Sequence, residues 1–143
     1  MKGDRYHSAI LFPAVKKLSR VMIFCLAFIP LAGLASPLVT ATYQHADGSE
    51  LSVKIEVGSP PPASLILIQK LPPGTNILHS QPPAQKINPA KGEAKWLFRK
   101  LKPGTLTVSF SLDRQVKTAE VSGQIRFKSS GSEEMESLPV SKP

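Results

Sequence analysis

Apolar and polar residues alternate with a period of two through the stretch from residue 94 to residue 112. A Leu-Lys-Pro-Gly sequence interrupts the alternation, which then continues on the far side. The apolar positions are Trp96, Phe98, Leu106, Val108, Phe110 and Leu112. Because successive side chains of a strand point to opposite faces, these positions predict a core-facing side. We therefore expect two antiparallel strands here, joined by a tight turn at Pro103-Gly104.

The same alternation predicts strands elsewhere in the chain. Residues 37–44 and 51–57 alternate on either side of an Asp-Gly pair, which signals a short connection. Residues 121–127 alternate as well, and segments 76–79 and 85–88 are open as two more short strands. About seven short strands, with Pro- and Gly-rich turns and no helical period, predict an all-β sandwich. Its expected core is Leu51, Val53, Ile55, Leu65, Leu67, Trp96, Phe98, Leu106, Val108, Phe110, Val121, Ile125 and Phe127.

The first 35 residues do not resemble a domain. Five basic residues precede the apolar run Val21–Ala35, which ends in small residues. This order predicts a secretory signal peptide cut after Ala35, with a cut after Ala41 as the second option. The protein is then exported, to the periplasm, the outer surface or the extracellular space. We accordingly divide the chain into a signal peptide (1–35), a sandwich (36–128) and a polar, disordered tail (129–143).

An uncleaved membrane anchor is the alternative for the leader. No charged residue occurs from residue 21 to residue 46, which is long enough to cross a bilayer. Pro30 and Pro37 interrupt this run, which favours cleavage. Contact with a membrane is expected only if the leader is kept.

The charge of the chain depends on the leader. The whole chain has 18 basic and 10 acidic residues, a formal net charge of +8. The leader holds five of the basic residues and one of the acidic residues, which leaves 13 and 9, or +4, for residues 36–143. This mild excess does not indicate a nucleic-acid-binding protein. The one cysteine, Cys25, lies in the leader, so the expected domain must be stable without a disulfide.

Three short motifs of turn and core residues occur in order along the chain, Leu71-Pro72-Pro73-Gly74-Thr75, Gly92-Glu93-Ala94-Lys95-Trp96-Leu97 and Leu101-Lys102-Pro103-Gly104. With the strands around them, from about Leu51 to Lys128, they resemble the DUF11 conserved repeat domain of bacterial surface proteins. They correspond to the family's "lPaG" turn, "WxLGxL" strand and "PG" turn. The resemblance implies an immunoglobulin-like sandwich with a structural or adhesive role. This chain departs from the family in having one copy, and in having Gly58-Ser59-Pro60-Pro61-Pro62 where the family often has Asn-x-Gly.

Residues with catalytic or metal-binding chemistry are sparse after the leader. His45 and His79 are isolated and lie beside predicted turns, so they do not predict a metal site. Glu93 and Asp113 could form a carboxylate pair only through the fold. No phosphate-binding loop, nucleophile elbow or catalytic-cysteine motif is present in the sequence. We expect neither an enzyme nor a cofactor.

The candidate partner surface comprises Ile66, Ile68, Lys95 and Arg99. The Leu65–Ile68 strand is apolar on both sides and is bracketed by prolines, so we expect an edge strand with an apolar outer face. That face is either a binding surface or is covered by the tail or by another strand. Lys95 and Arg99 belong to a basic cluster, which is either a solvated strand face or a patch for an acidic partner. Trp96 could stack on a sugar, but its alternation with Phe98 favours the core.

The sequence thus predicts an exported, non-enzymatic module that binds another envelope or surface protein, associates with itself, or serves as a structural component. The alternatives are a carbohydrate-binding module for cell-wall or matrix polysaccharide and a membrane-anchored domain. Few aromatic residues stand at exposed-type positions, which favours protein–protein contact.

Overall fold

A computed structural model describes residues 38–129 and 131–143 as an all-β fold of two antiparallel sheets. The leader, where the preferred cleavage site after Ala35 and the anchor alternative fall, lies outside the described residues. The second cleavage option, after Ala41, falls within the first strand. The strands are β1 (Val39–His45), β2 (Gly48–Val57), β3 (Ser64–Lys70), β4 (Ile77–Gln81), β5 (Lys86–Asn88), β6 (Glu93–Arg99), β7 (Gly104–Val116), β8 (Ser122–Lys128) and β9 (Met135–Pro139). Two short 3-10 turns, η1 (Pro89–Lys91) and η2 (Thr118–Glu120), interrupt the connections.

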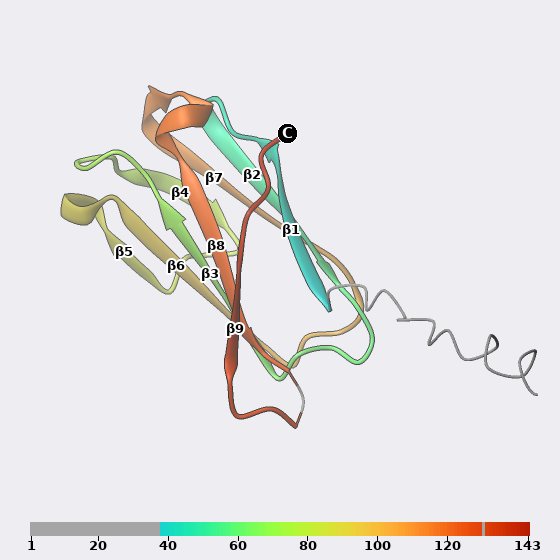
Figure 1. Ribbon diagram of the computed structural model, residues 1–143. Helices are drawn as coiled ribbons and strands as arrows, with labels where there is room; N and C mark the ends of the chain where they lie inside the picture. Colours follow the sequence, from blue (N-terminus) through green and yellow to red (C-terminus); the bar gives the residue numbers. More distant parts are fainter. Residues whose placement is uncertain (1–37, 130) are drawn as a thin grey trace, which may run out of the picture. The chain divides into compact units, whose positions relative to one another are not determined.

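The strands form a sandwich of two layers (Figure 1). The four-stranded sheet has the order β1-β2-β7-β4, and the five-stranded sheet has the order β5-β6-β3-β8-β9. The longest strand pair is β2 with β7, where Val53 lies opposite Val108. The expectation of an all-β sandwich of antiparallel strands is therefore confirmed.

The core lies between the two sheets and is built from the apolar side of each strand. Eleven of the expected core residues are buried there; Phe98 and Leu106 are partly buried and pack against the others. Trp96 is 1% exposed, and its ring centre lies 5.3 Å from that of Phe110 in the opposite sheet. Its indole Nε1 donates to Ser80 Oγ at 2.9 Å and to the Pro82 carbonyl at 3.0 Å, so the polar atom of this buried ring is satisfied.

The connection between η1 and β6 requires a glycine. Gly92 has φ +59°, and a Cβ built there would lie 2.0 Å from the Leu71 carbonyl oxygen. The carbonyl oxygen of Gly92 accepts a hydrogen bond from the Leu71 amide at 2.7 Å. Any larger residue would therefore push apart the start of β6 and the end of β3.

Two sequence-based expectations are wrong. The Leu65–Ile68 strand is not an edge: β3 lies between β6 and β8, in the middle of the five-stranded sheet. An apolar run indicates cover on both sides, but its own residues do not say which strands pair with it.

The expected disordered tail forms β9, which pairs with β8 and continues to the edge of the other sheet. Leu138 lies opposite Ile125, and Val140 is only 5% exposed. Beyond β9, the amide of Tyr43 donates to the Ser141 carbonyl, and the amide of Ser141 donates to the Ala41 carbonyl, both at 2.9 Å. Two inward apolar residues and these backbone hydrogen bonds hold a segment whose composition is otherwise polar.

Candidate binding surfaces

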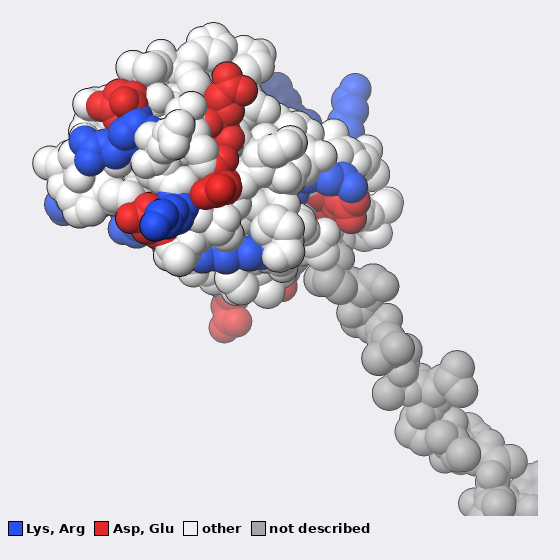
Figure 2. All heavy atoms as spheres, turned by 90° about the horizontal axis from the view of Figure 1, so that it is seen from above, with Lys and Arg blue, Asp and Glu red and all other residues white. Residues whose placement is uncertain are grey.

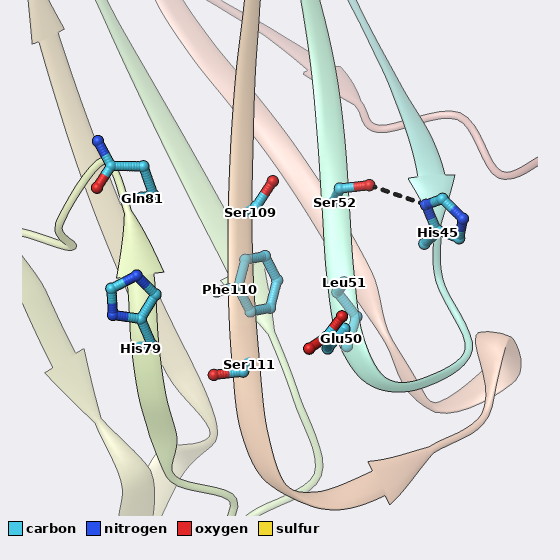
Figure 3. Close-up of a pocket in the computed structure, with 9 residues that line it drawn as sticks. All are labelled: His45, Glu50, Leu51, Ser52, His79, Gln81, Ser109, Phe110 and Ser111. Carbon is cyan, nitrogen blue, oxygen red and sulfur yellow. Dashed lines mark hydrogen bonds between the residues drawn. The ribbon is translucent and has the colours of Figure 1, made fainter.

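A shallow hollow lies on the outer face of the four-stranded sheet (Figure 3), and we call it the polar hollow after the serine, histidine and glutamine side chains around it. Its volume is about 390 Å³. Ser109 and Ser111 of β7 lie in the middle, His79 and Gln81 of β4 stand on one side, and His45 of β1 stands on the other. The hollow arises because small serines on β7 and β2 lie between longer side chains on the flanking strands. Its polar lining consists of hydroxyl, amide and imidazole groups and Glu50, and Leu51 and Phe110 also line it.

The hollow contains one serine–histidine pair. His45 Nδ1 and Ser52 Oγ are 3.2 Å apart, on adjacent strands. A serine nucleophile needs a histidine that a third group orients, as well as a site for the developing oxyanion. Within the described residues no third group is bonded to His45. The pair therefore has the character of a surface hydrogen bond.

The outer face of the five-stranded sheet has an apolar centre. Ile66 lies opposite Leu97 on one side and Arg126 on the other, and Ile68 lies opposite Lys95 and Gln124. Leu97, Ile66 and Ile68, which we call the apolar track, are all partly exposed. Their strand neighbours point inward, as the burial of Leu65, Leu67 and Trp96 shows. In the described part of the chain, β3 pairs only with β6 and β8, and β9 lies beside β8 rather than over the track.

Basic side chains surround the apolar track. Those that share this face through strand pairing are Lys70, Lys86, Lys95, Arg99, Arg126 and Lys128. Lys86, Arg99, Arg126 and Lys128, which with Lys95 form the basic rim, have no ion-pair partner among the described residues. The one acidic side chain that the described strands contribute to this face is Glu93, which binds Lys70 and Lys95 at 2.5 and 2.9 Å. Hydrogen bonds from Lys70 and Lys95 lower the pKa of Glu93 to about 2, so it is ionised at all physiological pH values.

A second hollow, of about 480 Å³, lies at the β6–β7 turn. Its lining combines apolar side chains of β2, β6 and β7 with Thr105 and three cations. The cations are Arg99 at the end of β6 and Lys100 and Lys102 in the turn, and we call these three residues the basic turn. Lys100 has φ 55°, a left-handed conformation that costs free energy for a residue with a side chain. Of the described residues, none forms an ion pair with these three cations.

The structure brings together the four residues of the candidate partner surface. Ile66, Ile68 and Lys95 lie side by side on the outer face, and Arg99 lies at the end of the same face, opposite Ser64. Sequence reasoning missed Leu97, Lys86, Arg126 and Lys128. Leu97 carried a signal, because it is an apolar residue on the polar side of an alternating strand. The three cations carried none, since their place beside the track depends on strand pairing.

Three further observations concern the chemistry of the molecule. In the described ranges, no group of three or more His, Cys, Asp or Glu residues is arranged to hold a metal ion. Glu93 and Asp113 do not form a pair: Asp113 accepts hydrogen bonds from Asn76, which lower its pKa. No helix among the described residues is long and apolar enough to span a membrane.

Comparison with protein-family models, with curated proteins and with solved structures found no match for this chain.

Proposed function

We propose that this protein is an exported, immunoglobulin-like binding module that docks a partner protein on the outer face of its five-stranded sheet. The observation that supports this proposal most directly is the apolar track within the basic rim, where, among the described residues, only Lys95 forms an ion pair. A solvated strand face carries polar residues, whereas three adjacent aliphatic side chains cost free energy unless something covers them. An interface with an apolar centre and a charged border has the usual anatomy of a specific protein–protein contact.

The charge of this face selects the kind of partner. Six basic side chains stand against one acidic side chain, so two copies facing each other through this surface would repel. An acidic protein surface with an apolar centre is complementary to it. We therefore assign this face to a different envelope or surface protein rather than to a second copy.

The resemblance to the DUF11 repeat supports the immunoglobulin-like and extracellular parts of the proposal. The turns Leu71-Pro72-Pro73-Gly74 and Leu101-Lys102-Pro103-Gly104 lie at strand ends. They resemble the "lPaG" and "PG" turns of the family. The basic leader followed by Val21–Ala35 supports export.

Site-specific photo-crosslinking in the host tests this function. A photoreactive residue is placed at Ile66 or Ile68 and, as a matched control, at Thr107, which lies on the outer face of the four-stranded sheet opposite Lys54. We expect a discrete product with an acidic protein from Ile66 and Ile68 and none from Thr107. The pair Ile66→Thr and Ile68→Thr should weaken capture of the same protein by tenfold or more while the melting temperature stays near that of wild type. Equal products from both faces would contradict the proposal.

The carbohydrate alternative would use a different surface of the sandwich. Trp96 is buried and offers no ring face, so a sugar would have to bind the hydroxyl and imidazole groups of the polar hollow. Titration with cell-wall and matrix polysaccharides, compared between wild type and His79→Ala, tests this alternative. Binding that is lost in His79→Ala but unchanged in Ile66→Thr would favour it over protein docking.

A further inference from the structure

Two loops of opposite charge lie at the same end of the sandwich, toward opposite edges of the five-stranded sheet (Figure 1). The basic turn follows β6, and an acidic loop, Glu133-Glu134, precedes β9. Strand pairing puts them at the same level: Ser64 lies opposite Arg99 on one side and Lys128 on the other, and Lys128 lies opposite Met135.

Among the described residues, the two loops form no ion pair with each other within one molecule. The sheet order β6-β3-β8-β9 separates them by three strand spacings, or about 14 Å. In the part of the chain that the structure describes, neither Glu133 nor Glu134 forms an ion pair, and neither does any cation of the basic turn. Each molecule therefore presents two unpaired charged loops of opposite sign.

The apolar groups next to the charges are complementary too. Met135 directly follows the two glutamates and is 39% exposed, so its side chain is accessible to a neighbouring molecule. The lining of the hollow beside the basic turn includes the apolar side chains of Val57, Phe98 and Leu106, and its volume of about 480 Å³ has room for a side chain of that size. Methionine adapts readily to an irregular apolar cavity.

We propose that the occupant of the hollow is a second copy of this chain, with the acidic loop and Met135 of one molecule docked at the basic turn of the next. Such a contact is heterologous, because it joins different surfaces of the two molecules, and it repeats along a row or closes into a ring. Contacts between like loops are disfavoured, since two basic turns repel each other and so do two acidic loops. The other end of the sandwich has acidic and basic side chains interspersed, and so no comparable separation of charge (Figure 2).

The self-association site shares Leu97 with the apolar track and Arg99 with the basic rim, but Lys100 and Lys102 belong to neither. The test accordingly leaves the apolar track and the basic rim unchanged. The turn variant is Lys100→Gln with Lys102→Gln, and the loop variant is Glu133→Gln with Glu134→Gln. A control variant, Lys91→Gln with Lys117→Gln, removes two charges at the other end of the sandwich.

Analytical ultracentrifugation of the chain, purified from its host with the N-terminus that it carries there, measures assembly against concentration at low and at high salt. We expect concentration-dependent assembly of wild type and of the control at low salt. The turn and loop variants should each associate about tenfold more weakly, as the loss of two exposed ion pairs implies. An equimolar mixture of the two variants retains one intact contact per pair and should form dimers that do not extend.

Four results would overturn the inference. They are a wild-type chain that stays monomeric at low salt up to its solubility, a turn or loop variant that assembles as wild type does, a control variant that loses assembly equally, and a mixture that forms no dimer. Far-ultraviolet circular dichroism of every variant shows that the comparison is made between folded molecules.

Discussion

The hydroxyl of Tyr43 donates a 2.8 Å hydrogen bond to Oε1 of Gln69 and thereby links the two sheets through the middle of the core. Tyr43 belongs to β1 of the four-stranded sheet and Gln69 to β3 of the five-stranded sheet. The amide nitrogen of Gln69 donates to the carbonyls of Lys70 and Ser122 at 3.0 and 3.1 Å. The buried Gln69 amide thus has partners for both its oxygen and its nitrogen, as a side chain without solvent access requires.

Removing the Tyr43 hydroxyl should destabilise the fold. Tyr43→Phe leaves the Gln69 oxygen buried without its donor, and we expect the free energy of unfolding to fall by about 1–3 kcal/mol. Denaturant unfolding measures the change. A double-mutant cycle with Gln69→Leu isolates the interaction of the two side chains. A Tyr43→Phe variant as stable as wild type would show that the hydrogen bond contributes nothing net.

The same pair predicts how stability depends on alkaline pH. Burial raises the pKa of Tyr43 to about 12 from its ordinary value of 10.0, and the hydrogen bond to Gln69 opposes this only in part. Because the unfolded chain releases the proton first, the stabilisation is complete below pH 10 and is lost as pH rises toward 12. The loss is about 2–3 kcal/mol at most.

The matched measurement compares wild type with Tyr43→Phe from neutral pH to about pH 12. The other tyrosine, Tyr6, lies in the leader, so Tyr43 is the one phenol expected to titrate within the sandwich. Wild type should lose stability more steeply than the variant at the alkaline end. Parallel curves would show that Tyr43 ionises at its ordinary pKa in the folded protein.

Trp96 should be the most costly single truncation in the core. Trp96→Ala removes a ring that is 1% exposed and leaves the Pro82 carbonyl without its indole donor. We expect a loss of about 3–5 kcal/mol, compared with about 1–3 kcal/mol for Trp96→Phe, which keeps a ring but not the donor. Thermal and denaturant unfolding check the order. A Trp96→Ala variant that melts near wild type would contradict the burial and revive sugar stacking on this ring.

We predict that the leader is removed during export, which mass spectrometry can test. Cleavage after Ala35 gives a mature protein that begins at Ser36 and is soluble without detergent. The intact mass of protein exported from its host, with N-terminal sequencing, checks this. A mature chain that still contains Val21–Ala35 and fractionates with membranes would establish the anchored alternative instead.

The sequence predicted most of the strands because their two faces differ in polarity, and it failed where pairing decides the outcome. The alternation of Leu51–Val57 fixes its face in the sandwich without knowledge of its neighbours. The position of β3 depends on which strands flank it, which no local pattern contains. The apolar track could be predicted in part, since Ile66 and Ile68 stand out within one strand, but its basic rim comes from β5, β6 and β8.

The sequence did not predict the ordered C-terminal segment, because few of its residues are apolar and buried. Gly123 of β8 has no side chain, and a Cβ there would lie 2.7 Å from Val140 Cγ2 and 2.8 Å from the Tyr43 hydroxyl. The glycine therefore makes the space that Val140 and Tyr43 share. A single buried valine after a polar stretch is too weak a pattern to predict a strand, yet it closes the edge between the two sheets.

Replacing Gly123 should therefore release the C-terminal segment while most of the sandwich stays folded. In Gly123→Ala the new methyl group cannot fit beside Val140, because packed cores do not yield by the ångström that this contact requires. Val140 carries much of the segment's buried apolar surface, so we expect residues 131–143 to detach from β8 and β1 before the core strands unfold.

Limited proteolysis measures this release. Cleavage near Lys128 should become much faster in Gly123→Ala than in wild type, with fragments identified by mass. Gly131→Ala serves as the control for the loop itself, since its positive φ adds backbone strain but its Cβ would meet no atom within 4 Å. Val140→Ala should accelerate cleavage as Gly123→Ala does, because it removes the same anchor from the other side. Unchanged cleavage in both Gly123→Ala and Val140→Ala would show that β9 is held by its backbone pairing with β8 alone.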